Sequence, residues 1–165
     1  MLETRLKVDL GDIEELSRQY PKASVDARNM KITEALALLE REVIMRTPRG
    51  AGPIHLGDSI FSQTRISGLK VTGIVGTPLE HGVPVELGTK PHFPPIGPLK
   101  HWVERKLGIT GDKEAGRVAH AIAWKIARRG TEGAHMFEKG FDASEGRVVR
   151  ILGEIPDEIV RRVSK

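Results

Sequence analysis

The strongest constraint on the fold is a long helical pattern between Pro21 and Arg46. Four large apolar residues recur there at three- and four-residue spacing, which places them on one side of an α-helix. They are Ile32, Leu36, Leu39 and Val43. Glu42 and Arg46 lie four residues apart, so we expect them to pair on the outside of this helix. Pro48 and Gly50 end it, and the apolar side is expected to pack on a small β-sheet.

Short apolar runs bounded by turn residues predict the strands of that sheet. They are expected at residues 4–10, 59–66, 69–75 and 83–87. Ser67 and Gly68 suit a tight turn that joins the middle two into a hairpin. Gly73 indicates a bulge or a close backbone approach. Residues 12–20 predict one or two helical turns, and residues 47–57 a loop.

The stretch VELGTKPHFPPIGPL, residues 85–99, carries four prolines within eight residues. It predicts a rigid link into a helix that Gly97 caps, Pro98 starts and Gly108 ends. The apolar side of this helix would hold Leu99, Trp102, Val103 and Leu107. The stiffness of the link is the feature that a function has to explain.

A longer helix is expected from Asp112, as its cap, to Arg129, with Gly130 ending it. Its inward face would hold Ala115, Val118, Ala119, Ile122 and Ile126. From Ala134 onward the chain is predicted to be mostly helical. Interruptions are expected near Gly140, Gly146, Gly153 and Pro156.

Composition narrows the class of protein. Aromatic residues are few, two Trp, one Tyr and four Phe, so the core is thin and neighbouring subunits are expected to add stability. Cysteine is absent, and no apolar run approaches the 18 residues of a membrane span. The start lacks the apolar core of a signal peptide. We therefore expect a soluble, cytoplasmic protein.

The charge of the chain is only mildly basic. Its net charge of +4 comes from 26 basic residues interleaved with 22 acidic ones, whereas DNA-binding proteins usually carry a denser basic stripe.

Motifs that carry chemistry fail when they are tested one by one. GAGPIHLG lacks a glycine of the dinucleotide fingerprint, GITGDK lacks the spacing of a P-loop, and no GxSxG is present. His101 and Glu104 could be two ligands of a metal ion, but the sequence pattern provides no third ligand for them. Glu86 is better explained as a carboxylate that accepts backbone N–H groups. Trp102 and Trp124 could stack on bases, but core or interface packing is favoured. We expect no enzyme, and no catalytic, cofactor or metal site.

From the end of the long helix onward, short motifs follow one another in a fixed order. They are Pro48; Leu56, Gly57 and Ser59; Val75-Gly76-Thr77; Val85-Glu86; Gly88-Thr89; and Pro91-His92. GTEGAHMFEKGF, residues 130–141, then precedes the last helix. In this order the chain resembles the neck and tail-component proteins of long-tailed bacteriophages, a family of small head–tail joining or tail-completion proteins. It departs from the pattern in a helix-rich insertion at residues 94–114 and in the altered glycine and leucine order at 50–59.

The resemblance covers residues 4–165 and implies a single domain over residues 1–165. The fold class expected is α+β, a small antiparallel sheet packed by one long helix and two to three further helices. The resemblance also implies a structural virion protein assembled in the host cytoplasm. Its partners would be copies of itself in a ring, a hexamer or dodecamer, with neighbouring neck and tail proteins. Double-stranded DNA would pass through the ring without its sequence being read.

In such a ring, a stiff and partly apolar connector suits a contact between subunits, because a pre-ordered segment loses less entropy on association. The candidate interface residues are Pro91, His92, Phe93, Pro94, Pro95, Arg49 and Gly50. A loop packed on its own domain explains the prolines equally well. Candidate charges facing the lumen are Lys125, Arg128, Arg129 and Glu132. The alternative function is a basic nucleic-acid-binding module, whose affinity should fall steeply with salt.

Overall fold

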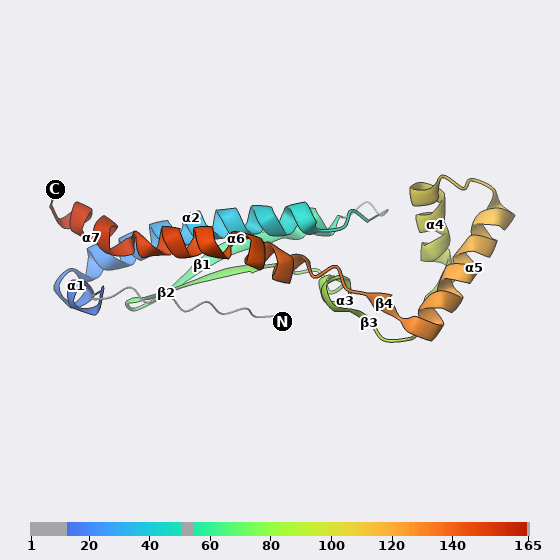
Figure 1. Ribbon diagram of the computed structural model, residues 1–165, viewed down its shortest axis with the longest axis horizontal. Coiled ribbons are helices and arrows are strands. Elements are labelled where there is room, and N and C mark those ends of the chain that lie inside the picture. Colours follow the sequence, from blue (N-terminus) through green and yellow to red (C-terminus); the bar gives the residue numbers. More distant parts are fainter. Residues whose placement is uncertain (1–12, 51–54, 165) are drawn as a thin grey trace. The chain divides into compact units, whose positions relative to one another are not determined.

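The computed structural model describes residues 13–50 and 55–164 (Figure 1). The fold is α+β, as predicted. The chain divides into two compact units. The hairpin unit holds the residues up to Arg46, Ile60–Thr77 and the residues from Phe137 onward. The α4–α5 unit holds Thr47–Ser59 and Pro78–Met136. The expected single domain over residues 1–165 stays a prediction, because two compact units can also be parts of one domain that folds cooperatively.

The hairpin unit is built on the long helix α2 (Pro21–Arg46), which packs along a two-stranded antiparallel sheet (Figure 1). The strands are β1 (Phe61–Ser67) and β2 (Lys70–Gly76). Gly73 confirms the predicted close approach, since a methyl group there would lie 2.8 Å from Leu36 and 2.9 Å from Ile32. Leu36 and Val43 are buried, whereas Ile32 and Leu39 are partly buried. The stripe predicted from the sequence therefore does face the sheet at Gly73.

The hairpin turn differs by one residue from the prediction. Ser67 pairs with Lys70, so the two-residue loop is Gly68-Leu69. Gly68 has φ +58°, a conformation that suits the tight turns joining twisted antiparallel strands. Leu69 therefore lies in the turn, and only Val71, Gly73 and Val75 alternate toward α2.

The remaining helices of this unit are α1 (Ile13–Gln19), α6 (Met136–Gly153) and α7 (Ile155–Val163). Ala27 of α2 forms a buried cluster with Ile155 and Ile159 of α7, and Ile13 and Leu16 of α1 pack against it. Of the predicted interruptions in the tail, the break at Gly153 is confirmed. Those at Gly140 and Gly146 are wrong, because α6 runs through both residues.

Gly140 is needed for contact between helices. A methyl group at this position would lie 2.7 Å from Cγ2 of Val43 and 3.1 Å from its backbone N and Cα. A methyl group at Gly146 of the same helix would meet no described atom within 4 Å. The two glycines of α6 therefore have different roles.

These contacts predict opposite effects of the same substitution. Gly140→Ala should lower the free energy of unfolding by about 1–3 kcal/mol, because α6 must move away from α2. Gly146→Ala should raise it by roughly 0.5–1 kcal/mol, because alanine favours an exposed helix interior. Urea unfolding followed by circular dichroism checks both. Equal effects of the two substitutions would contradict the contact at Val43.

Glu42 lies inside the unit, which corrects the expected surface position. It is 8% exposed. It accepts a 2.6 Å hydrogen bond from Arg46 and another of 2.6 Å from Arg147 of α6. The hydrogen bond from Arg46 has the larger effect and the one from Arg147 the next largest. Together they hold the pKa of the Glu42 carboxyl below its ordinary value. The predicted pair exists, and a third charge from α6 allows it to be buried.

The predicted strand at residues 83–87 is wrong. These residues form helix α3 (Gly82–Leu87), in which the N–H of Val85 bonds the carbonyl of His81 at 3.2 Å. Pro84 lies in the first turn, where its missing N–H costs no intrahelical bond. The strand β3 is only Gly88–Thr89, paired with β4 (Thr131–Glu132).

The two helices predicted after the prolines are confirmed as α4 (Ile96–Leu107) and α5 (Asp112–Arg129). Gly108 ends α4 with φ +69°. Pro95 and Gly111 occupy the two N-cap positions, in place of Gly97 and Asp112. Leu56–Ser59, predicted as loop and strand start, forms a 3₁₀ helix. The predictions for residues 4–10 and 51–54 lie outside the described residues.

Candidate interaction surface

Three glycines fix the place where α3, the proline-rich segment and α5 meet. Gly88 has φ +78° and ψ −175°, and Gly130 has φ +70° and ψ −157°, a region that essentially only glycine adopts. A methyl group at Gly130 would lie 1.9 Å from the carbonyl oxygen of Thr89. One at Gly133 would lie 2.2 Å from that of Glu86. The backbones of residues 86–90 and 130–133 thus cross at a distance that side chains would prevent.

Hydrogen bonds complete this crossing. The N–H groups of Ala134 and His135 donate to the carbonyls of Val85 and Glu86, at 2.8 and 3.1 Å. The hydroxyls of Thr89 and Thr131 lie 2.9 Å apart. Glu86 is buried at the same place, which favours the structural explanation of this acid over a catalytic one.

Helices α4 and α5 pack on a core made of small residues. Val103 of α4 and the α5 residues Ala115 and Ala119 are fully buried, and five partly buried apolar residues surround them. Those five are Ile96, Leu99, Ile109, Val118 and Ile122. Lys100 also pairs with Asp112, and this hydrogen bond raises the pKa of the lysine. The predicted inward face of α5 is confirmed at these positions.

The α4–α5 unit leaves large apolar side chains in contact with solvent. Trp102 and Leu107, predicted to face the core, are 39% and 51% exposed, so that part of the α4 prediction is wrong. Val83 and Leu87 of α3 are also exposed. A core built from alanine and valine is too thin to cover them. In the sequence, only the low aromatic content and the small residues of α5 indicated that large apolar side chains of this unit would be exposed.

Three residues join the proline-rich segment to the end of α5. The ring of Phe93 meets the ring of Trp124 edge to face, with centroids 5.6 Å apart and planes at 80°. The guanidinium of Arg128 lies over the same indole, 6.0 Å from its centroid. Phe93 is 50% and Trp124 57% exposed. The result is an ordered aromatic surface beside positive charge.

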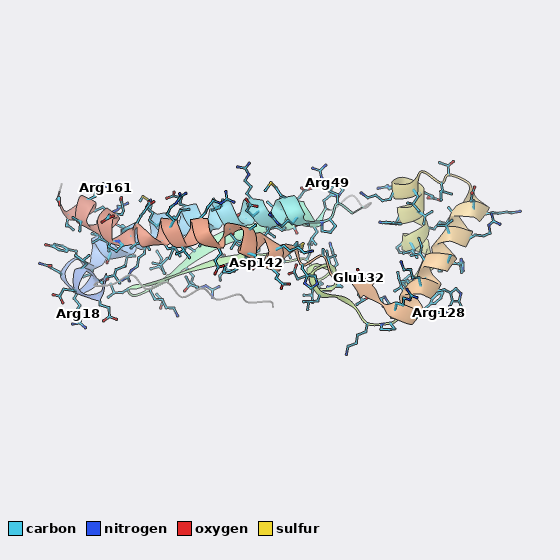
Figure 2. All side chains as sticks on the ribbon, viewed as in Figure 1. Arg18, Arg49, Arg128, Glu132, Asp142 and Arg161 are labelled. Carbon is cyan, nitrogen blue, oxygen red and sulfur yellow. The ribbon has the colours of Figure 1, made fainter. Side chains whose placement is uncertain are left out.

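The candidate interface residues are thus placed as follows. Pro91, His92 and Pro95 are exposed and Pro94 is partly buried, in the irregular segment between β3 and α4. His92 Nδ1 lies 2.9 Å from the carbonyl oxygen of Lys90, which holds the segment locally. Arg49, labelled in Figure 2, and Gly50 follow α2 and are exposed.

The candidate lumen charges lie at the C-terminal end of α5 and just beyond it, where Figure 2 labels Arg128 and Glu132. Lys125, Arg128 and Arg129 are exposed in the last turns of the helix, where positive charge suits the helix dipole. Glu132 is exposed in β4, where its backbone pairs with Gly88. Of this set, Arg128 is the residue that contacts the aromatic pair. Whether any of them faces a lumen stays a prediction.

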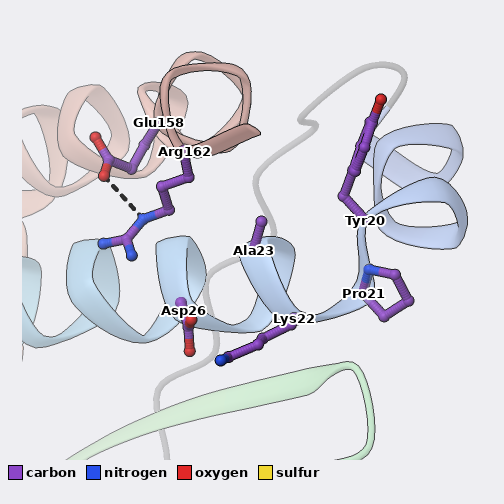
Figure 3. Close-up of a pocket in the computed structure, with 7 residues that line it drawn as sticks. All are labelled: Tyr20, Pro21, Lys22, Ala23, Asp26, Glu158 and Arg162. Carbon is purple, nitrogen blue, oxygen red and sulfur yellow. Dashed lines mark hydrogen bonds and ion pairs between the residues drawn. The ribbon is translucent and has the colours of Figure 1, made fainter. Parts of the chain in front are cut away.

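A polar depression in the hairpin unit is a second candidate site (Figure 3). It has a volume of about 590 Å³ and is lined by residues of α7, of α2 and of the turn that precedes α2. Its clearest charged pair is internal, since Arg162 Nε donates to Glu158 at 2.9 Å. Carboxylate and guanidinium there neutralise each other. The depression therefore offers no distinct acid–base arrangement.

Residues 13–50 and 55–164 contain no group of three His, Asp or Glu side chains placed to hold a metal ion. His101 Nδ1 and Glu104 do lie 3.5 Å apart, but as a pair. No helix in the same ranges is long and apolar enough to cross a membrane.

Comparisons with models of protein families, with curated proteins and with solved structures found no match to this chain.

Proposed function

We propose that this chain is a structural virion protein, a ring-forming component that joins head to tail or completes the tail of a long-tailed bacteriophage. The observation that carries the proposal is the aromatic and apolar surface of the α4–α5 unit. Exposed Phe93, Trp102 and Trp124 lie on a unit whose own core is alanine-rich. Phe93 and Trp124 are in contact and form one exposed aromatic group, and exposed apolar groups of this kind mark surfaces that other proteins cover.

The order of the motifs also supports the proposal. Leu56, Gly57 and Ser59 form the 3₁₀ turn before the hairpin. Val75 and Gly76 end β2, and Gly88-Thr89 form β3. These three motifs thus fall at boundaries between elements, where backbone geometry restricts the choice of residue.

The proline-rich segment suits a contact with a neighbouring subunit. Its backbone is restricted by Pro91, Pro94 and Pro95, and its aromatic side chain is already held against Trp124. Little conformational entropy remains to be lost when a partner covers such a segment. Electron microscopy of the purified protein should reveal annular particles with a central hole. Particles without closure would contradict a ring.

The alternative, a nucleic-acid-binding module, has one specific observation in its favour. Trp124 is exposed with Arg128 over its ring, and Lys125 and Arg129 are close in sequence. Single-strand binders combine exposed aromatic rings with positive charge in this way. A passage for duplex DNA should instead hold the phosphates weakly, because tight contacts would retain the moving duplex.

We therefore expect weak binding to duplex DNA, with a dissociation constant of about 10⁻⁴ M or higher at physiological salt. Gel shifts with the intact protein measure it. As a control, Arg65→Ala with Lys70→Ala removes two exposed charges from the hairpin. Nanomolar binding that Arg128→Ala with Arg129→Ala abolishes, and the hairpin control keeps, would favour the nucleic-acid module.

A further inference from the structure

The side of α5 that faces away from α4 carries a basic stripe. Five exposed residues recur there at three- and four-residue spacing: Lys113, Arg117, His120, Trp124 and Arg128. At about 100° per residue these positions share one side of the helix, opposite the buried Ala115 and Ala119. His120 is held by its own helix, since its Nδ1 lies 2.9 Å from the carbonyl oxygen of Gly116. The basic stripe contains one large apolar group, the indole of Trp124.

Helix α6 carries an acidic stripe of the same form. Its exposed residues Glu138, Asp142, Glu145 and Val149 also recur at three- and four-residue spacing. They lie on the side of α6 roughly opposite its buried face, which holds Gly140, Ser144 and Val148. The acidic stripe therefore presents carboxylates and one apolar side chain to the outside of the hairpin unit.

The two stripes match position by position. Lys113, Arg117, His120 and Trp124 are separated by steps of four, three and four residues, and so are Glu138, Asp142, Glu145 and Val149. If the helices lie parallel and in register, Lys113, Arg117 and His120 each meet a carboxylate and Trp124 meets Val149. Arg128, the last member of the basic stripe, lies opposite Gly153. In the antiparallel arrangement Trp124 would meet Glu138 and Lys113 would meet Val149. Charge complementarity therefore selects one orientation.

This parallel contact cannot form inside one chain. The connection from Arg129 to Met136 would have to return along the whole of α5, about 27 Å, and also cross to the second helix axis, roughly 8–10 Å away. The intervening residues span at most about 25 Å when fully extended. Thr131 and Glu132 are also held in β4. A parallel pairing of the two stripes therefore requires the acidic stripe of another copy.

We propose that the basic stripe of α5 in one copy packs parallel and in register on the acidic stripe of α6 in the next copy. This inference rests on the proposed function and identifies the surface that assembles the ring. The two surfaces differ, so the contact is heterologous, and repeated heterologous contacts form a ring when the rotation between neighbouring copies closes. Exposed charges are screened by salt, so this association weakens as ionic strength rises.

Charge reversal tests the contact through the molecular mass of the intact protein in solution. Arg117→Glu alone and Asp142→Arg alone should each weaken self-association by at least roughly tenfold, because each places like charges opposite each other. The double variant Arg117→Glu with Asp142→Arg should restore it. Arg129→Glu is the matched control, an exposed residue of α5 outside the basic stripe with the same change of charge.

Cross-linking tests the register. Because the chain contains no cysteine, every thiol in the experiment comes from an introduced residue. Ala121 and Gly146 directly follow His120 and Glu145, both are exposed, and neither belongs to a stripe. A mixture of one chain carrying Ala121→Cys and another carrying Gly146→Cys should form dimers linked by a short bifunctional maleimide, which spans the roughly 9 Å between the two edges of the contact that a disulfide would not. Either chain alone should not, since the contact joins different surfaces.

The outcomes separate the helix pairing from the ring. A wild-type oligomer that Arg117→Glu disturbs no more than Arg129→Glu would overturn the pairing and leave the ring standing. Cross-links within the Ala121→Cys chain alone would show a symmetric contact and also overturn the pairing. A wild-type chain that stays monomeric and gives no mixed cross-link would overturn both.

Discussion

Gly130→Ala is expected to lower the free energy of unfolding of the α4–α5 unit by about 3–5 kcal/mol. The backbone of Gly130 has φ +70° and ψ −157°, which costs any other residue roughly 1–3 kcal/mol. The added methyl group would also lie 1.9 Å from the carbonyl oxygen of Thr89, so β3 and β4 would have to separate. Such overpacking typically adds about 1–3 kcal/mol.

Gly108→Ala is the control for backbone strain alone. Gly108 also has a positive φ, +69°, but with ψ 17° it lies in the left-handed region, and a methyl group there would meet no described atom within 4 Å. We expect a loss of about 1–2 kcal/mol. Denaturant unfolding followed by tryptophan fluorescence reports on this unit, because Trp102 and Trp124 are the two tryptophans of the chain. Similar losses for both variants would contradict the backbone crossing.

Leu36→Ala is expected to destabilise the hairpin unit by about 2–5 kcal/mol. Leu36 is buried, and both of its methyl groups point at Gly73, which has no side chain to fill the space left behind. Far-UV circular dichroism during urea unfolding measures the loss.

The matched control lies on the same helix. Ile44 is 39% exposed, so Ile44→Ala should lower the free energy of unfolding by less than about 1 kcal/mol. If the two substitutions destabilised the protein equally, the hairpin would not be packed on the side of α2 that carries Leu36.

The elements that sequence patterns predicted correctly are those fixed by local spacing. The apolar stripe of α2 and the inward face of α5 each repeat over several turns, so chance matches are few. Gly73 indicated a bulge or a close approach because glycine weakens a strand and is usually found inside one for such a reason. Gly108 and Gly130 marked the ends of α4 and α5 for the same conformational reason.

The errors occur where tertiary contacts decide. Residues 83–87 alternate like a strand, yet the crossing at Gly88 leaves room for one turn of helix and a two-residue strand. Gly140 resembled a helix breaker because its reason, the contact with Val43, lies far away in the sequence. Glu42 was predicted to be exposed because Arg147, the second cation that permits its burial, is also distant.

The candidate surface could be predicted only in part. The prolines identified a stiff segment, and Trp124 was singled out for its aromatic ring. The pairing of Phe93 with Trp124 joins residues from separate elements, which no local pattern reveals. The three- and four-residue spacing of the stripes on α5 and α6 is visible in the sequence. The proposed pairing also depends on which sides of these helices are exposed, and only the structure gives that.

The most direct test of the proposed ring is the mass of the purified wild-type protein in solution over a wide range of concentrations, alone and with neighbouring virion proteins. The chain has a mass of 18.2 kDa. We predict one dominant species with the mass of a closed hexamer or dodecamer, which forms as concentration rises or when a neighbour is added. A species that remains at 18.2 kDa at every concentration, and also in the presence of those neighbours, would contradict the account.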